Sequence, residues 1–446
     1  MADEESRKKI EISEICRVEG HSAVHVEIEG DKVTQVKLDV FEGTRFFERL
    51  IVGHHQDEIP HITSRVCAIC STGHVIAAIR AVERIAGFTP NATVSLLREL
   101  MHLGMIIESN ATHIYALALP DFLGFNNVHK FASEHTEEFK AWTSLRNIGA
   151  LIQTTIGGRP FHPVNLHVGG FSSFPKLESL LQIKSLLQEN LQLTIRTCEV
   201  LMRFPPSVRR TSEPIFFALI PEGDHYGYFG TKIRATSGFE CDVNDYKSYL
   251  KEEAVSHSHA KRSSVNGQPI MVGSMARLAL FGSLLTGEAK SIYGSSAMSS
   301  GDNNTIWNNL AQAIEIVEAF HRAVSIVAEL ERTADVWNTF EARQHTRVKL
   351  DATAGSGCGT VECPRGTLYH YYEIDNKGKV SKADMVTPSA QNTYRIERDI
   401  QEVVSQLLPS ETDESATNLR ANLETLVRAY DPCNTCATHM VSLRIT

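Results

Sequence analysis

Two C-x-x-C pairs at opposite ends of the chain constrain its fold most strongly. Cys67 and Cys70 lie in the segment Arg65–His74, whereas Cys433 and Cys436 lie close to the C-terminal end. Four soft thiolates in two such pairs suit Zn²⁺, an iron–sulfur cluster or another thiophilic metal. A zinc ribbon has its pairs only about 15–20 residues apart, so a local zinc site is disfavoured. If the pairs meet, the whole fold builds the site, which indicates a catalytic metal.

Composition and length restrict the class of protein. The chain has 446 residues and 42% hydrophobic content, enough for a large core. Because joined terminal pairs put both ends in one body, we expect a single large catalytic domain over residues 1–446, with insertions. The net charge of −9 and the pI near 6.1 argue against nucleic acid and against an anionic membrane surface as partners.

The cysteine count and the apolar pattern indicate a compartment. Nine cysteines, an odd number in a long chain, do not fit a secreted disulfide framework. The first residues lack an apolar signal core, and no run reaches the roughly 18 apolar residues of a membrane span. We therefore expect a cytoplasmic protein with no direct membrane span.

Hydrophobic periodicity predicts an α+β fold that is mainly α, with a central long-helix bundle and peripheral antiparallel strands. Alternating apolar residues predict an N-terminal hairpin over 10–40, and helical spacing predicts a helical core over 71–203 and 305–332. Within that core the individual helices are expected near residues 75–86, 93–109, 137–151, 177–203 and 305–332.

The remaining segments are more irregular. Glycine, proline and aromatic residues predict strand and loop insertions over 205–270 and 348–386. A last helix over 415–430 delivers the C-terminal metal-binding segment 431–439. A short apolar tail, 440–446, follows this segment.

Local context alone assigns no special role to several reactive residues. Glu19 and Glu48 by themselves are best explained as exposed carboxylates. Cys198 lies on the apolar face of a predicted helix and is expected in the core, whereas Cys358 and Cys363 are not spaced as metal ligands. His74 falls in the first turn of the helix that follows Cys70, where a hydrogen bond to a ligand sulfur is credible.

The two cysteine motifs and their surroundings resemble the large subunit of a nickel–iron hydrogenase. Further blocks of the chain resemble that family in the expected order, namely Arg17–His21, Arg45–Glu48, Gly157–Arg159, Val272–Arg277 and Glu362–Gly366. The segments Thr44–Glu48 and Ala118–Asp121 are more similar to the cytoplasmic, multisubunit branch than to membrane-bound uptake enzymes. Cys363 departs from the alanine that is commoner in the family, and we interpret it as a tolerated small residue near the site.

The resemblance implies a role for each of the four thiols. Cys67 and Cys433 are expected to be terminal nickel ligands, and Cys70 and Cys436 to bridge nickel to an iron that carries CO and cyanide. Thiolates are polarizable donors of the kind that a redox-active nickel requires.

It also implies the groups that surround the metals. Glu19 is expected to begin the proton relay close to Cys433, since a carboxylate can take up a proton and pass it on. Arg365, which is permanently charged, is expected to lie over the metals, with Asp121 and Asp431 holding its guanidinium.

A second metal, Mg²⁺ or Fe²⁺, is implied further out. Its expected ligands are Glu48, the backbone carbonyl of Val386, His439 and waters in an octahedral shell. In the resembling family a protease usually cuts just after the histidine, so the tail Met440–Thr446 is expected to be removed.

The implied function is reversible heterolytic cleavage of H₂ into protons and electrons. Because the chain has no spare cysteine set for an electron relay, the iron–sulfur clusters are expected only in a small subunit, with further diaphorase or ferredoxin-type subunits beyond it. The acceptor at the end, whether NAD(P), a deazaflavin, ferredoxin or a bifurcating combination, is left open.

Three alternatives remain. A hydrogen sensor would keep the site but turn over slowly. A quinone-reductase-like subunit of the same fold would have lost the thiols, which all four cysteines argue against. A structural zinc protein is disfavoured by the spacing of the pairs.

Overall fold

The computed structural model describes residues 7–125, 127–208, 212–344, 346–407 and 413–438. One large hydrophobic cluster includes residues from Ile12 near the start to Ala437 near the end. Both ends of the chain therefore contribute to the same core. Within the described ranges, no helix combines the length and the apolar composition needed to cross a bilayer.

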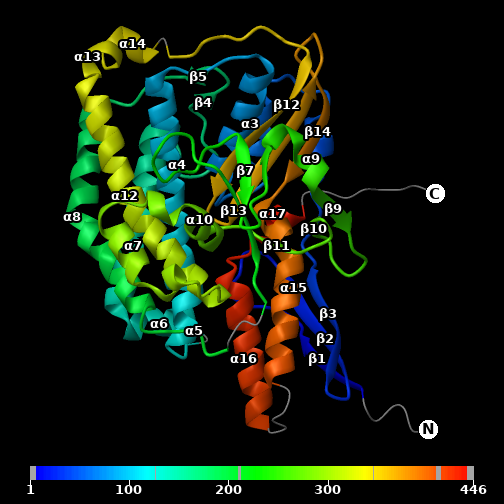
Figure 1. Cartoon of the computed structure of the whole chain (residues 1–446). Helices are drawn as coiled ribbons and strands as arrows, with labels where there is room; N and C mark the ends of the chain where they lie inside the picture. Colours follow the sequence, from blue (N-terminus) through cyan, green and yellow to red (C-terminus); the bar gives the residue numbers. More distant parts are fainter. Residues whose placement is uncertain (1–6, 126, 209–211, 345, 408–412, 439–446) are drawn as a thin grey trace.

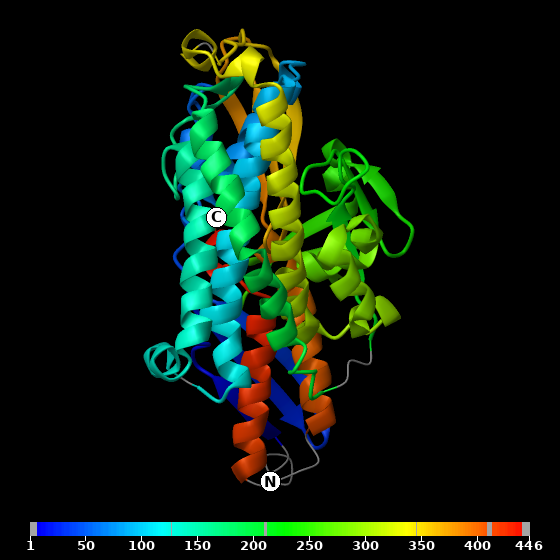
Figure 2. The ribbon, with the colours of Figure 1, turned by 90° about the vertical axis from the view of Figure 1, so that its left-hand side faces the viewer.

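A bundle of long helices forms one side of the molecule (Figures 1 and 2). Its members are α4 (Ala92–Thr112), α7 (Thr136–Gly157), α8 (Leu177–Leu201) and α12 (Asn308–Arg332). Apolar residues at helical spacing, such as Leu100 and Leu103 of α4, are buried between them. The prediction of a bundle of long helices is confirmed, although the bundle lies on one side of the molecule and not at its centre.

Helices α4 and α7 pack with almost no side chain between them at one point. A Cβ at Gly104 would lie 2.9 Å from the carbonyl oxygen of Gly149, and a Cβ at Gly149 would lie 2.5 Å from that of Gly104. Only glycine lets two backbones approach this closely, so these positions fix how the two helices cross.

The helical region after α4 extends further than the sequence pattern predicts. A π-helix, His113–Ala118, continues directly into α5 (Leu119–Phe122). Pro120 lies within the first two positions of α5, which tolerate proline. The proline therefore does not end the helical region.

A second layer is an antiparallel sheet of β12 (Gly355–Cys363), β13 (Gly366–Ile374) and β14 (Val380–Val386). Helix α3 (Ser71–Ile85) packs on it so closely that a Cβ at Gly359 would lie 2.1 Å from the carbonyl oxygen of Ala77. The sheet thereby brings the two-residue turn Pro364–Arg365 toward the start of α3, where the first cysteine pair lies.

A third element is the N-terminal sheet of β1 (Arg7–Ile12), β2 (Ser22–Glu29) and β3 (Lys32–Val40). Strands β2 and β3 form the predicted hairpin, and β1 adds a third strand to it. In Figure 1 the sheet lies beside α15 (Pro388–Leu407), near α16 (Asp413–Ala429). The short helix α17 (Asn434–Ala437) lies at the centre, between the sheets and α15.

The other elements are short. The remaining α-helices are α1 (Phe47–Ile51), α2 (Ile59–Thr63), α6 (Val128–Glu134), α9 (Tyr246–Tyr249), α10 (Ser274–Phe281), α11 (Gly287–Ser295), α13 (Ala334–Trp337) and α14 (Phe340–Gln344). The remaining strands are β4 (Leu166–His167), β5 (Gly170–Phe171), β6 (Ile215–Leu219), β7 (Lys232–Ala235), β8 (Glu240–Asp242), β9 (Leu250–Ala254), β10 (Lys261–Val265) and β11 (Ile270–Met271). Short 3₁₀ helices are Val243–Asp245, Gly282–Leu284, Ala297–Ser300 and Thr305–Trp307. The fold is α+β and mainly α, as predicted.

Candidate metal centre

The four predicted ligand cysteines meet in one buried cluster. The sulfur atoms of Cys67 and Cys433 lie 3.6 Å apart, and those of Cys433 and Cys436 lie 2.8 Å apart. One sulfur from each of Cys67, Cys433 and Cys436 fits within a group no wider than 4.8 Å. Cys70 completes the cluster at the N-terminal end of α3. All four are free thiols.

Hydrogen bonds from surrounding residues hold the two cysteine loops together. Arg45 donates to the carbonyl oxygens of Val66 and Thr435, which belong to the first and the second loop respectively. The start of α15 also supports the second loop. There the Ser389 hydroxyl accepts from the backbone N–H of Cys433 at 2.9 Å. Hydrogen bonds within the protein therefore position the two cysteine loops.

The electrostatics of the cluster favour the thiolate at Cys433 and Cys70, whereas a hydrogen bond with Cys433 holds the pKa values of Cys67 and Cys436 well above their usual range. Burial opposes ionisation of Cys433, but hydrogen bonds from Cys436 and Cys67, together with the charge of Arg365, outweigh it and lower its pKa to about 6. Hydrogen bonds from Cys433, Cys436 and Cys67 also hold the pKa of Cys70 well below its usual range. Thiolates are the form in which cysteine binds metals, so this donor set fits a thiophilic metal such as nickel or iron.

Glu19 lies against the second cysteine pair. Its backbone forms an isolated parallel bridge with Cys433, and its carbonyl accepts from the N–H of Asn434 at 2.9 Å. Its carboxylate accepts from the N–H of Thr435 at 3.1 Å and from the Thr435 hydroxyl. Burial, followed by the charge of Cys433, raises the pKa of Glu19 to about 7. This carboxyl group can therefore exchange protons near neutral pH.

Arg365 reaches the cluster from the turn between β12 and β13. Its Nη1 donates to the sulfur of Cys70 at 3.4 Å and to the Ser109 hydroxyl at 3.3 Å. Its Nε and Nη2 donate to the carbonyl and to the carboxylate of Asp431 at 2.7 and 2.8 Å. Gln312 donates to the other carboxylate oxygen of Asp431 at 3.1 Å. A permanent positive charge thus lies beside one thiol and is fixed by one aspartate.

Asp121 does not hold Arg365, contrary to expectation. Its carboxylate oxygens accept from Arg17 and, at 2.5 Å, from Arg428. With both oxygens engaged by these two cations, Asp121 makes no hydrogen bond or ion pair with Arg365 in the described part of the chain. It holds Arg17, close to Glu19 in sequence, against the end of α16.

His74 belongs to a chain of hydrogen-bonded side chains with His370 and Tyr372. Its Nδ1 is 2.9 Å from Nε2 of His370, whose Nδ1 is 2.6 Å from the Tyr372 hydroxyl. These three side chains connect the first turn of α3 to the middle of β13. The expected hydrogen bond from His74 to a ligand sulfur stays a prediction.

The residues expected at a second metal also lie near one another. The Glu48 carboxylate accepts from the backbone N–H of Met385 at 2.7 Å, next to Val386 at the end of β14. The Thr387 hydroxyl then donates to the carbonyl of Cys436 at 3.1 Å. Glu48 and Val386 are thus brought to the second cysteine loop, whereas His439 and the tail 440–446 lie outside the described residues.

Sequence reasoning missed several residues of this site. Thr435 fixes the Glu19 carboxylate, Gln312 fixes Asp431, and Ser109 accepts from Arg365. Only Thr435 carried a usable signal, because it lies between the two cysteines of the second pair. Ser109 and Gln312 are single polar residues on long apolar helices, and only the tertiary fold brings them to the site.

Comparison with known proteins assigns the chain to a family. The sequence profile of the nickel-dependent hydrogenase family matches residues 45–150 and 222–439. The chain is 36% identical over 434 residues to the alpha subunit of sulfhydrogenase 1 from Pyrococcus furiosus, covering 97% of this chain and 98% of that one. It is 30% identical over 426 residues to a subunit of the F420-non-reducing hydrogenase vhu from Methanococcus voltae, covering 90% and 99%.

Solved structures show the same fold. An NAD⁺-reducing [NiFe]-hydrogenase in the H₂-reduced state superposes with a TM-score of 0.79 at 24% identity, covering 97% of this chain and 99% of that one. The Ni-Fe-Se hydrogenase of D. vulgaris Hildenborough superposes with a TM-score of 0.72 at 19% identity, covering 97% and 100%. The chain therefore belongs to the nickel-dependent hydrogenase family and is the catalytic subunit of a nickel–iron hydrogenase, an oxidoreductase that acts on H₂.

Proposed function

We propose that the chain catalyses reversible heterolytic cleavage of H₂ at a nickel–iron centre held by Cys67, Cys70, Cys433 and Cys436. The observation that carries this proposal is the convergence of four free, buried thiols from the two ends of the chain. By the family resemblance, Cys67 and Cys433 would hold the nickel, and Cys70 and Cys436 would hold both the nickel and an iron that carries CO and cyanide. When bound, such a centre supplies the Lewis acidity and the electron storage that H₂ cleavage requires.

Glu19 acts as the proton acceptor next to Cys433. A general base works best when its pKa lies near the working pH, and the pKa of Glu19 is raised to about 7. The two hydrogen bonds from Thr435 fix the orientation of the carboxylate. From there the proton leaves toward solvent, and the reverse reaction uses the same groups.

Arg365 stabilises negative charge at the centre and does not transfer protons. Its guanidinium is buried against Asp431 and Cys70, and these negative neighbours raise its pKa still further against the opposing effect of burial. It cannot act as a base at any physiological pH. A fixed cation aimed at the thiolates and their ligands is instead an electrostatic device that needs no reorganisation during the reaction.

A second metal, Mg²⁺ or Fe²⁺, would be held by Glu48, the Val386 carbonyl and His439, of which His439 lies outside the described residues. Carboxylate and carbonyl oxygens are the donors that such a hard cation prefers. The position of Glu48 beside β14 and the link from Thr387 to Cys436 support this assignment. The ion would connect the second cysteine loop to the N-terminal part of the chain.

Electrons leave through a partner. Hydrogenase large subunits pair with small subunits, and we propose that an iron–sulfur small subunit receives the electrons and that diaphorase or ferredoxin-type subunits follow it. Relatives of this chain include a subunit of the NAD-reducing hydrogenase of Cupriavidus necator and one of an F420-non-reducing hydrogenase of Methanococcus voltae. The acceptor is decided by those subunits.

Metal analysis and isotope exchange of the purified complex test the proposal together. We expect nickel and iron in the complex and H₂-dependent exchange of deuterium into solvent. Zinc in place of nickel, or loaded nickel with no exchange activity, would contradict it.

A further inference from the structure

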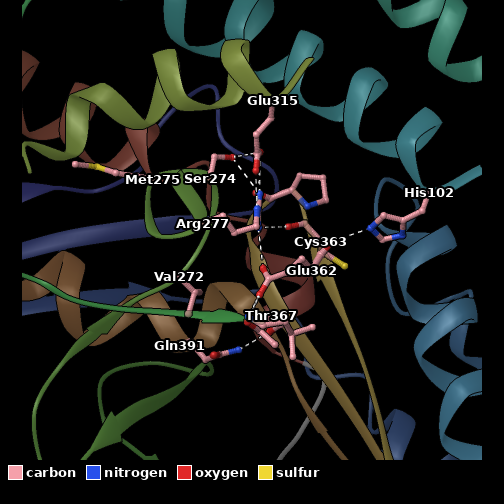
Figure 3. A network of polar contacts seen from close by, with 12 residues as sticks. His102, Val272, Ser274, Met275, Arg277, Glu315, Glu362, Cys363, Thr367 and Gln391 are labelled. Atoms are coloured by element: carbon pink, nitrogen blue, oxygen red, sulfur yellow. Dashed lines mark hydrogen bonds and ion pairs between the residues drawn. The ribbon is translucent and has the colours of Figure 1, made fainter. Parts of the chain in front are cut away.

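A buried arginine, Arg277, lies between two buried glutamates, Glu315 and Glu362 (Figure 3). Nε of Arg277, from α10, donates to Glu315 of α12 at 2.6 Å, and Nη1 donates to Glu362 of β12 at 2.8 Å. The three side chains are 1%, 0% and 0% exposed. Burying three charged side chains costs desolvation free energy, which their mutual contacts must offset.

The same guanidinium also binds the backbone just before Arg365. Nη1 of Arg277 donates to the carbonyl of Cys363 at 2.9 Å, and Nη2 donates to that of Pro364 at 3.1 Å. These are the two carbonyls that precede Arg365 in the chain. Arg277 therefore fixes the turn from which Arg365 extends.

This turn needs support because of its sequence. Cys363 pairs with Gly366, so Pro364 and Arg365 form a two-residue hairpin loop. Two-residue loops favour turns with positive φ at the first central residue, which the fixed φ of proline forbids. Buried carbonyls at such a turn need donors, and Arg277 donates to those of Cys363 and Pro364.

Neighbouring groups hold both glutamates in place. Glu315 accepts from the hydroxyls of Tyr226 and Ser274, each at 2.6 Å. Glu362 accepts from the Thr367 hydroxyl at 2.6 Å and from the N–H of Leu219 at 2.8 Å. Because both carboxylates are fixed, they fix the plane of the arginine between them, and this geometry suits a guanidinium only.

The opposite side of Arg365 is held by the same helix. Gln312, three residues before Glu315 on α12, donates to Asp431 at 3.1 Å. Asn308, one turn earlier, donates to the carbonyl of Ala429 at 2.8 Å. One face of α12 thus supports both Asp431 and, through Glu315 and Arg277, the turn that carries Arg365.

We propose that Arg277, oriented by Glu315 and Glu362, is a positioning residue that keeps the Arg365 guanidinium between Asp431 and Cys70. It acts through the carbonyls of Cys363 and Pro364 and does not touch the thiols itself in the described part of the chain. The proposal rests on the proposed function, in which Arg365 faces the metal centre.

The substitution Arg277→Lys tests this. Lysine keeps the charge but cannot donate in one plane to two carboxylates and two carbonyls. In the purified hydrogenase complex we expect nickel content near that of wild type and turnover lower by on the order of 10–100-fold, as for a catalytic group displaced by about 1 Å. The infrared bands of the diatomic iron ligands should shift or broaden, and amide exchange in peptides spanning residues 362–368 should become faster.

Arg98→Lys is the matched control. Arg98 forms a buried bidentate pair with Glu83, at 2.8 Å for both bonds, toward the end of α3 that lies away from the cysteines. It should lower thermal stability while leaving the infrared bands and the exchange at 362–368 unchanged. If Arg277→Lys alters bands, exchange and turnover no more than Arg98→Lys does, Arg277 is only structural and the proposal is wrong.

Glu315→Gln serves if the lysine variant does not fold. It keeps the shape of the side chain but weakens its hold on Arg277, so a smaller change in the same bands and peptides is expected, and unchanged bands and exchange would overturn the proposal. A wild-type complex without nickel or exchange activity would instead contradict the proposed function, whatever the variants do. The two failures are thereby distinguishable.

Discussion

Glu19 and Cys433 are backbone partners in an isolated parallel bridge, although they lie near opposite ends of the chain. The carboxylate of Glu19 also accepts two hydrogen bonds from Thr435, within the second cysteine pair. The proton acceptor and the thiol are therefore fixed to each other by the same short segment.

The substitution Glu19→Gln should separate metal binding from catalysis. Glutamine keeps the shape and can still accept from the N–H of Thr435, so nickel content should stay near that of wild type. Turnover should fall by on the order of 10²–10⁴-fold, the usual contribution of a positioned acid–base group. Hydrogen–deuterium exchange into solvent should fall with it. Near-normal exchange in a nickel-loaded Glu19→Gln enzyme would mean that another base accepts the proton.

Arg365→Lys should retain the metals but impair the reaction. Lysine keeps the positive charge, yet it cannot hold Asp431 through two nitrogens while a third points at Cys70. We expect a fall in turnover of at least about 10-fold, since removal of one preorganised charge-stabilising donor commonly costs 10²–10³. Arg398→Lys, on the exposed face of α15, is the control and should have no effect. Equal turnover of the two variants would exclude an electrostatic role for Arg365.

A second carboxyl group gives a pH-dependent stability. Glu108 of α4 is buried between α4 and α7, and this burial raises its pKa to about 7 against the charge of Arg146 and a hydrogen bond from Gln153. The unfolded chain has the ordinary glutamate pKa, so the folded state is favoured by protonation. Its contribution to stability is complete below the unfolded pKa of 4.5 and is lost as pH rises through about 7.

Glu108→Gln should remove this dependence. The free energy of unfolding of the variant, relative to that of the wild type, should therefore increase as the pH rises from 5 to 8. The increase should be at most about 3 kcal/mol, the value for the full pKa shift of Glu108. Thermal unfolding of both proteins at the two pH values measures the difference. Glu137→Gln, an exposed change on the neighbouring helix α7, should show no such trend. A constant stability difference across this range would show that Glu108 is ionised in the folded protein at both values.

The C-terminal tail gives a prediction that is independent of these residues. In the family that the chain belongs to, maturation usually removes the residues after the metal-binding histidine, so we expect cleavage after His439 in the active enzyme. Intact mass measurement of nickel-loaded protein decides this. A C-terminal peptide that still ends in Arg444–Ile445–Thr446 would show that this chain matures without trimming.

Much of the fold could be predicted because local patterns determine it. The alternation of Val24, Val26 and Ile28 gives a strand with one buried face, and the two-residue turn after Glu29 sets its first pairs with β3, up to a bulge between Glu27 and Ile28. The long helices follow from apolar residues at a spacing of three and four. The meeting of the two cysteine pairs was predictable for a chemical reason, because each pair supplies only two of the four thiolates that one metal site would take.

The surroundings of the thiols could not be predicted in the same way. Asp121 was expected at Arg365 but is held by Arg428, a cation on a distant helix that no local pattern connects to it. Likewise Arg277, Glu315 and Glu362 come from three separate elements. Such partners are chosen by tertiary packing, which brings together single polar residues whose own segments give no sign of the contact.

The central claim is that the four thiols hold a nickel-containing catalytic centre, and nickel content measured together with H₂-driven isotope exchange tests it most directly. The comparison is between wild type, Cys433→Ala and Cys198→Ala, since Cys198 is a buried thiol on α8 outside the cluster. We predict that Cys433→Ala lacks nickel or activity, whereas Cys198→Ala keeps both and loses only about 1–3 kcal/mol of stability. A Cys433→Ala protein with full nickel and full exchange activity would contradict the account.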